Sequence, residues 1–133
     1  MKWSASFKSI GLDAVIFPAL PLPALPNGLP GKLTACISSM FIANLLHWPS
    51  GVVPVSQVHS FEEHYEIHQI PENQRDKLAQ LAQQAMQSSC GLPLAVSVLT
   101  PAFQDECCLR VMKEVERISE FTVKPSDFTR GVA

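Results

Sequence analysis

Three short apolar runs along the chain have the length and the β-branched character of strands. They cover residues 13–17, 51–55 and 94–99. The first has no polar residue after Asp13 and stops at Pro18, which is the pattern of a buried parallel strand. Pro54 lies inside the second run and limits how that strand pairs in a sheet, because proline has no N–H to donate.

The segment after the first strand is predicted to be a loop followed by a buried helix. Residues 18–31 contain five of the eleven prolines, so they form neither a helix nor a central strand. Residues 32–47 then give a helix that is apolar on nearly every side, which favours burial. His47 is expected to cap the negative end of this helix, and Pro49 ends it.

Two further helices follow in the second half of the chain. Pro71 and Glu72 open a helix with apolar residues on one side only, and Gly91 follows its end. Thr100 and Pro101 form a favourable N-cap and first-turn pair for the last helix, which is expected to run to about Phe121. The resulting β-α-β-α-β-α order indicates an α/β layer fold.

Charge is scarce and unevenly placed. Charged residues make up 17% of the 133 residues, against about 25% in typical soluble domains, and the net charge of −2 gives no footprint for binding nucleic acid. Between residues 14 and 61 the only charged side chain is Lys32, and residues 78–104 have none. Such blocks favour elements covered on both sides, as in part of a larger α/β layer; a small free-standing α/β domain with an apolar core is the alternative.

The chemistry-bearing residues form no recognisable metal or catalytic set. The adjacent Cys107 and Cys108 fit neither a disulfide framework nor zinc spacing, and nearby carboxylates are expected to raise the pKa of these thiols. His64 and His68 lie among glutamates, but the order differs from a metalloprotease helix and favours a solvated acidic loop. We therefore expect no metal and no cofactor.

A Lys-Ser catalytic pair is also not expected. Lys32 and Ser39 share a helix face, yet seven residues separate them by about 10 Å of helix rise, too far for the amine to activate the hydroxyl. The apolar stretch 33–46 is shorter than the roughly 20 residues of a membrane-spanning helix, so no transmembrane helix is expected in this chain.

Three sequence blocks carry a resemblance to a known family. They comprise residues 12–18 leading to Gly31-Lys32-Leu33-Thr34, residues 44–55 (NLLHWPSGVVPV), and Gly91-Leu92-Pro93-Leu94-Ala95-Val96 together with residues 104–117. Together they resemble the C-terminal portion of the fatty acid amide hydrolases, which belong to the amidase signature family. The likeness extends from about residue 12 to residue 118.

This resemblance implies a fold, an activity and a division of labour. It implies the C-terminal part of an amidase-signature α/β/α sandwich with a mixed sheet, so that residues 1–133 form a partial amidase domain, incomplete alone, with a loose tail at 122–133. Relatives hydrolyse carbon–nitrogen bonds of linear amides with a Ser-Ser-Lys set and no cofactor. That set lies in a Gly/Ser-rich segment with no counterpart among the six scattered glycines here, so we expect no catalytic residue and no activity in this chain alone.

The resemblance also implies substrate-binding residues. The positions that line the acyl channel of relatives match Thr34, Ile37 and Phe41, whose spacing places them on one helix face. The substrate of the full-length parent would be a fatty acyl amide, and that parent would be an intracellular, membrane-associated protein of endomembranes; a homodimer remains open. The alternative function is a non-catalytic lipid- or partner-binding α/β module.

Overall fold

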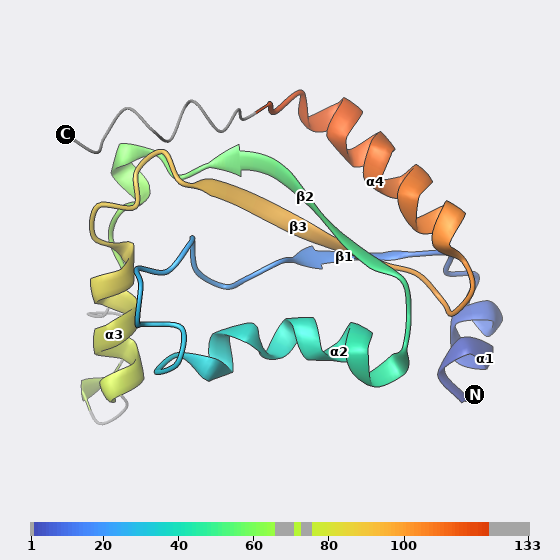
Figure 1. Ribbon diagram of the computed structural model, residues 1–133, viewed down its shortest axis with the longest axis horizontal. Coiled ribbons are helices and arrows are strands. Elements are labelled where there is room, and N and C mark those ends of the chain that lie inside the picture. The colour runs from blue at the N-terminus through green and yellow to red at the C-terminus, as the bar shows by residue number, and fades with distance from the viewer. Residues whose placement is uncertain (1, 66–70, 73–75, 123–133) are drawn as a thin grey trace.

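The computed structural model describes residues 2–65, 71–72 and 76–122, and it has a mixed α/β architecture (Figure 1). The expected loose tail at 122–133 lies outside the described residues except for Thr122. In chain order the elements are α1 (Lys2–Ser9), β1 (Val15–Pro18), the 3-10 turn η1 (Thr34–Ile37), α2 (Ser38–Leu46), β2 (Ser50–Gln57), the 3-10 turn η2 (Ser60–Glu62), α3 (Lys77–Met86), β3 (Pro93–Leu99) and α4 (Asp105–Ser119).

The three strands form one antiparallel sheet in the order β1-β3-β2. The prediction of a buried parallel strand at 13–17 is therefore wrong: β1 pairs antiparallel with β3, and its residues alternate between half-buried and exposed. The physical reason is that β1 is an edge strand. Val15 and Phe17 point to the face of the sheet that α2 covers. Ile16 points to the opposite face, where α4 packs mainly on β2 and does not cover β1.

Pro54 disturbs strand pairing as predicted. The register of β2 with β3 is regular from Ser50 to Pro54, which lies opposite Ala95, and shifts by one residue before Ser56. An extra residue on one strand is a β-bulge, which lets a proline remain in a strand that pairs on one side only.

Helix α4 covers one face of the sheet and packs on β2 and β3 (Figure 1). Cys108 lies on the sheet-facing side of this helix and is buried, with its Sγ 3.8 Å from the carbonyl oxygen of Val98. The helix begins at Asp105, so the prediction that Thr100 is its N-cap is wrong. Instead the Thr100 hydroxyl donates to the carbonyl oxygen of Gln104, and a turn with positive φ at Phe103 precedes the helix.

A separate apolar cluster joins the proline-rich loop to α3. Its buried members are Leu22, Leu29, Leu33, Ala82 and Ala85. The one-sided pattern of α3 is thus confirmed, but the helix begins at Lys77 rather than at Pro71. Its N-cap is Asp76, whose Oδ1 accepts a hydrogen bond of 2.9 Å from the backbone N–H of Ala79.

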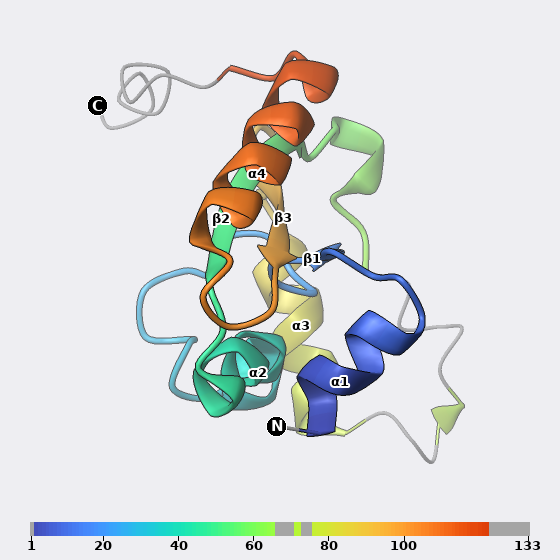
Figure 2. The same cartoon turned by 90° about the vertical axis from the view of Figure 1, so that its right-hand side faces the viewer.

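Helix α2 lies on the face of the sheet opposite α4 (Figures 1 and 2). It follows a 3-10 turn, and the chain leaves it through His47, which is the C-cap residue with a left-handed backbone at φ 52°. The predicted position of His47 at the end of the helix is confirmed, and a favourable interaction of its side chain with the helix dipole stays a prediction. The prediction of burial for 32–47 is wrong for α2: of its nine residues, all within the described part of the chain, none is buried. The sheet supports only one side of it.

The observed order of strands and helices agrees with an α/β fold. The strand–helix alternation predicted from residue 13 onward is present, and α1 adds a helix that the sequence pattern did not predict. Within the described residues, no helix combines the length and the apolar character needed to cross a membrane.

Candidate functional site

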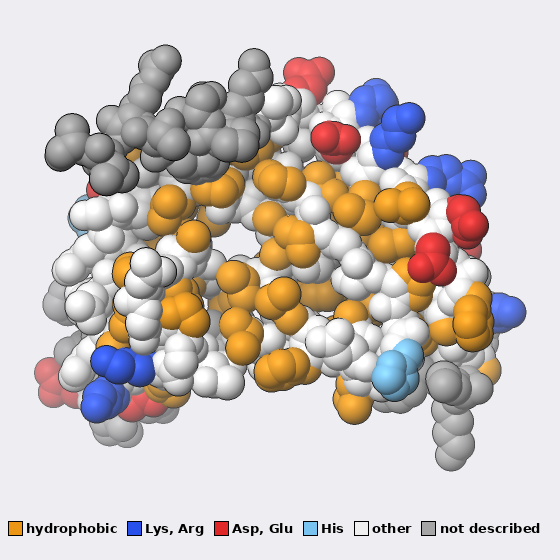
Figure 3. Space-filling view, viewed as in Figure 1, with side chains coloured by type: hydrophobic (Ala, Val, Ile, Leu, Met, Phe, Trp, Pro, Cys, Tyr) orange, Lys and Arg blue, Asp and Glu red, His pale blue; other side chains and the backbone are white. Residues whose placement is uncertain are grey.

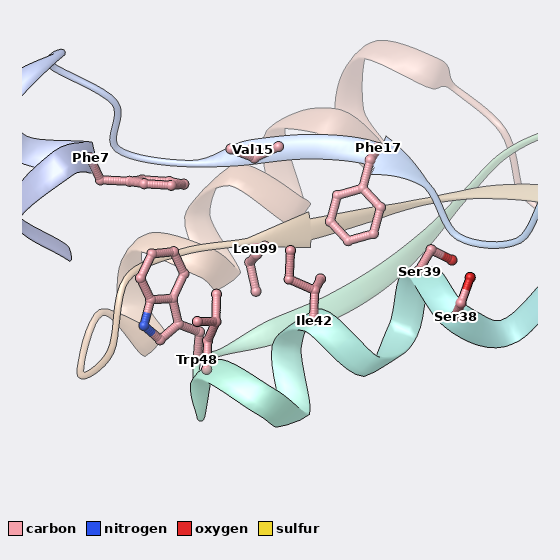
Figure 4. A pocket seen from close by; sticks show the side chains of 9 residues that line it. Phe7, Val15, Phe17, Ser38, Ser39, Ile42, Trp48 and Leu99 are labelled. Carbon is pink, nitrogen blue, oxygen red and sulfur yellow. The ribbon is translucent and has the colours of Figure 1, made fainter. Parts of the chain in front are cut away.

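An apolar cavity of about 490 Å³ lies between α2 and the sheet (Figure 4). We call it the α2 cavity. Its lining residues are Phe7, Val15, Phe17, Ser38, Ser39, Ile42, Leu46, Trp48 and Leu99. A volume of this size falls within the range of about 300–1,000 Å³ for small-molecule sites.

Strand register and helix spacing together build the walls of this cavity. Val15 on β1 lies directly opposite Leu99 on β3, so both side chains point to the α2 face of the sheet. On α2, the steps from Ser38 to Ile42 and from Ile42 to Leu46 are four residues each, which places all three on one helix face. The opposing walls therefore come from segments far apart in the sequence.

An aromatic pair closes one end of the α2 cavity. The rings of Phe7 on α1 and Trp48, just before β2, meet edge to face with centroids 4.8 Å apart. Trp48 is only 5% exposed, and its indole Nε1 has no hydrogen-bond partner among the described residues. In Figure 4 this nitrogen lies on the side of the ring turned away from Ile42.

Two hydroxyl groups lie at the other end. Ser38 and Ser39 line the cavity next to Phe17 (Figure 4), and none of the nine lining residues carries a charge. The Ser39 hydroxyl donates a hydrogen bond of 3.2 Å to the carbonyl oxygen of Ala19, so its oxygen lone pairs remain as acceptors. The cavity is therefore apolar along its length and weakly polar at one end.

A smaller, mostly apolar hollow of about 240 Å³ lies next to the proline-rich loop. Met40 on α2 and Val52 on β2 contribute to its walls, together with residues of the segments 19–24 and 93–95. Figure 3 shows hydrophobic side chains gathered around an opening that, in the view of Figure 1, lies between β3 and the loop that follows β1.

The predicted channel residues lie on a different side of the η1–α2 segment. Thr34 is exposed at the start of η1 and donates from its hydroxyl to the carbonyl oxygen of Gly31. Ile37 is half-buried, and Phe41 is 51% exposed. None of these three described residues is among the nine that line the α2 cavity, and their role in a channel stays a prediction.

The other polar candidates occupy structural positions. His59 caps η2, where its backbone N–H donates to Glu62 at 2.8 Å, and Glu63 accepts a hydrogen bond from the backbone N–H of Cys90. The described part of the chain contains no group of three or more side chains suited to hold a metal ion. His68 lies outside the described residues.

The pKa of the Cys108 thiol is raised, as the sequence predicted. Burial raises the pKa of Cys108, with a further contribution from the nearby Asp105 carboxylate. The sequence prediction attributed the raised pKa to local negative charge, whereas in the structure the larger cause is the burial of Cys108 between α4 and the sheet. At neutral pH this thiol is protonated and a weak nucleophile.

The sequence pattern missed the residues that close the cavity. Phe7 lies in an N-terminal segment with lysines and serines, for which the pattern predicted no element. Trp48 lies between His47 and Pro49, outside any helix or strand. The hydrophobic periodicity of the sequence therefore does not predict which residues it packs against. The one available signal was the presence of large aromatic residues at element ends, since aromatic rings bury much area wherever they pack.

Comparison with known proteins supports the resemblance to the fatty acid amide hydrolases. The chain is 38% identical over 122 residues to "Fatty-acid amide hydrolase 1" of Sus scrofa, a match that covers 92% of this chain. It is 35% identical over 105 residues, or 79% of the chain, to "Fatty acid amide hydrolase 1" of Caenorhabditis elegans. The chain corresponds to only 21% and 18% of the length of these relatives, and no protein-family model matches it.

Proposed function

We propose that this chain is part of a serine hydrolase that cleaves fatty acyl amides. The observation that carries the proposal is 38% identity over 92% of the chain to a protein named fatty-acid amide hydrolase 1. Only about a fifth of that relative is matched, so the nucleophile and its activating groups would lie elsewhere in the enzyme. The chain would supply strands and helices of an amidase-signature α/β/α sandwich.

Its contribution to the site would be binding rather than bond cleavage. Thr34, Ile37 and Phe41 would form one wall of the channel for the acyl chain. The exposure of Phe41 supports this role, because a half-exposed aromatic ring on a helix is available to a ligand or to a facing segment. The parent enzyme would act at intracellular membranes, and a homodimer would agree with the exposed apolar surface of α2.

The reaction would proceed by acyl transfer from the amine to a serine and then to water. The serines of α2 are poor candidates for that nucleophile. Ser39 uses its proton in the hydrogen bond to the Ala19 carbonyl, and no described acceptor side chain hydrogen-bonds to it as a base would. The catalytic serine would lie in the part of the enzyme that this chain does not match.

A fluorophosphonate probe, which reacts with catalytic serines, tests whether the nucleophile lies outside this chain. The purified 133-residue chain should neither react with the probe nor release fatty acid from oleamide. In the native source, peptides of this chain should co-purify with a species that does both, and the labelled serine should lie outside residues 1–133. Labelling of a serine within this chain would overturn the proposal.

The second candidate function is a non-catalytic lipid- or partner-binding α/β module. The observation that favours it is the exposed apolar side of α2, where Leu45 is 79% exposed one turn from Phe41. A module of this kind would bind its partner without any hydrolase activity in the native source. Co-purification of these peptides with probe-reactive activity distinguishes the first function from the second.

A further inference from the structure

We propose that a cleft at one end of the molecule binds a planar aromatic ligand that carries a negatively charged group. The cleft has a volume of about 370 Å³ and is formed by Ser4 and Lys8 of α1, Leu46 and His47 at the end of α2, and residues 101–104 between β3 and α4. Figures 1 and 2 show α1, the end of α2 and the β3–α4 connection gathered at the same end of the molecule. We call this site the Phe103 cleft. The inference goes beyond the proposed function, because it involves neither a hydrolase activity nor the predicted channel residues.

The first argument is the combination of backbone conformation and exposure at Phe103. Its φ of 64° lies in the left-handed region, which is unfavourable for a bulky side chain. Its ring is 95% exposed, so the fold gains almost no packing energy in return. Left-handed backbone at a residue other than glycine is concentrated at functional positions, including ligand clamps. A flat apolar group lying on this ring would supply the contact that the chain itself does not make.

The second argument is that a second residue of the same cleft has the same backbone conformation. His47 has a φ of 52°. The described residues other than glycine with positive φ are His47, Ser88, Phe103 and Glu120, so two of the four line this one cleft. Both of these residues carry flat rings, which can stack with a planar ligand. Stacking on two rings favours an aromatic ligand over a flexible aliphatic one.

The third argument concerns the polar side chains of the cleft. Ser4, Lys8, His47 and Gln104 carry hydrogen-bond donors, and none of these four side chains has a hydrogen-bond or ion-pair partner among the described residues. The remaining lining residues are apolar. Small-molecule sites typically combine apolar walls with a few polar groups that fix the orientation of the ligand. Donors without partners fit an anionic acceptor such as a carboxylate, which accepts strong hydrogen bonds.

Lys8 determines the sign of the charge. Among the described residues that line the cleft, it alone carries a full charge at neutral pH, and none is acidic. Asp105 and Glu106 follow at the start of α4, but they are exposed and do not line the cleft, so water and salt screen them. Lys8 is exposed as well, and its attraction for an anion is therefore modest. The rings would supply most of the affinity, and Lys8 the preference for a negative charge.

A titration with 2-naphthoate tests the site in the whole 133-residue chain. Backbone amide resonances of the isotope-labelled protein are followed by nuclear magnetic resonance, and we expect saturable shifts at Ser4, His47 and Gln104. The neutral analogue 2-naphthalenemethanol should bind about two- to fivefold more weakly in low salt, because it lacks the charge that Lys8 attracts. That difference should disappear in about 0.5 M sodium chloride, where exposed charges are screened.

Substitutions at Phe103 separate ligand binding from packing. Phe103→Asn removes the ring and introduces a residue that tolerates positive φ, so it should raise the urea midpoint of unfolding while weakening 2-naphthoate binding about tenfold. Phe103→Tyr keeps an aromatic ring and should retain binding. Lys8→Gln should weaken 2-naphthoate binding about two- to fivefold and leave the alcohol unaffected. Lys113→Gln, which removes an exposed lysine of α4, is the matched control and should change neither.

Several outcomes would overturn the inference. The first is the absence of saturable shifts, or shifts at Phe17 and Ile42 of the α2 cavity in place of those at the Phe103 cleft. Equal affinities for 2-naphthoate and the alcohol in low salt, or equal effects of Lys8→Gln and Lys113→Gln, would also contradict it. A Phe103→Asn variant less stable than the unmodified chain would make Phe103 a packing residue and remove the argument from strain. All of these results leave the proposed function standing, since fluorophosphonate labelling tests it independently.

Discussion

Phe7 and Trp48 meet edge to face, with planes at 87° and centroids 4.8 Å apart, and this contact joins the N-terminal helix to the start of β2. Helix α1 has only eight residues, and a helix this short is not stable in water without tertiary packing. The aromatic pair therefore has two consequences. It holds α1 against the rest of the fold, and it closes one end of the α2 cavity.

Removal of this contact should destabilise the chain. We expect Phe7→Ala to lower the free energy of unfolding by about 1–2 kcal/mol, because a half-buried ring and one aromatic pair are lost. Urea unfolding followed by circular dichroism measures the change. Phe103→Ala is the control, since that ring is 95% exposed and its removal should have almost no effect. Equal losses in the two variants would contradict the packing role of Phe7.

Gly51 and Met112 are predicted to be coupled across the interface of β2 and α4. A Cβ atom at Gly51 would overlap the Sδ and Cε atoms of Met112, whereas a Cβ at Gly31 would meet open space. Gly51→Ala should therefore cost about 1 kcal/mol, limited by the flexibility of the methionine end. Gly31→Ala, at a position with no neighbour to displace, should leave the interface intact.

A double-mutant cycle tests the origin of that cost. Met112→Ala removes the atoms that Gly51→Ala would displace, so the double variant should be more stable than the sum of the two single effects predicts. The free energy of unfolding of all four proteins gives the coupling. Strict additivity would show that the loss at Gly51 arises from the strand backbone and not from Met112.

The cap of α3 gives a third prediction. Asp76→Ala removes the acceptor of the hydrogen bond from the Ala79 backbone and should lower the free energy of unfolding by about 1 kcal/mol. Asp76→Ser and Asp76→Asn keep an acceptor at this position and should retain most of the stability. If all three variants lose the same amount, the side-chain cap is not the source of the effect.

Local sequence signals identified most of the strands and helices, but not how they pair. Residues 51–55 and 94–99 were predicted as strands because short β-branched runs carry their own signal. Parallel or antiparallel pairing depends on the path of the connections. The uninterrupted apolar run before Pro18 fits a parallel strand buried on both faces, and it fits equally an edge strand whose second face is uncovered.

Helix α2 shows the same limit for burial. Its composition predicted coverage on all sides, and the structure provides a sheet on one side only. The α2 cavity could not be foreseen either, since Phe7, Phe17 and Trp48 come together only through the register of β1 and the position of α1. The family resemblance came from motif order, which is a property of sequence alone and needs no tertiary contact.

Thiol labelling should separate the cysteines by burial. Cys90 is exposed, whereas Cys108 is buried and burial raises its pKa above the ordinary value of 9.0. Iodoacetamide labelling followed by peptide mass spectrometry should show Cys108 modified at least about tenfold more slowly than Cys90 in the native chain. The two rates should converge in denaturant. Equal native rates would contradict the burial of Cys108 between α4 and the sheet.

The same pKa shift gives a pH dependence with a defined sign. Because the folded-state pKa of Cys108 lies above the unfolded one, the neutral buried thiol stabilises the fold fully below pH 9.0. That contribution is lost as the pH rises through the folded-state pKa. Cys108→Ala should therefore flatten the decline of stability at alkaline pH, measured as urea midpoints over a pH series. A parallel decline in both proteins would assign the effect to other groups.

The outward side of α2 should dominate the surface hydrophobicity of the chain. Phe41 and Leu45 expose apolar side chains one turn apart on the same side of the helix, and contiguous apolar patches bind dyes and promote association. Their replacement by glutamine, a good helix former, should abolish most binding of anilinonaphthalene sulfonate to the native chain. The free energy of unfolding should fall by about 1–2 kcal/mol, because Phe41 is 51% exposed and the covered half of its ring is lost.

Leu109→Gln on α4 provides the matched control, since Leu109 is an exposed apolar residue on the other helical layer. It should leave dye binding nearly unchanged. If instead the double α2 variant still bound the dye as strongly as the unmodified chain, the outward side of α2 would not be the surface that binds the dye.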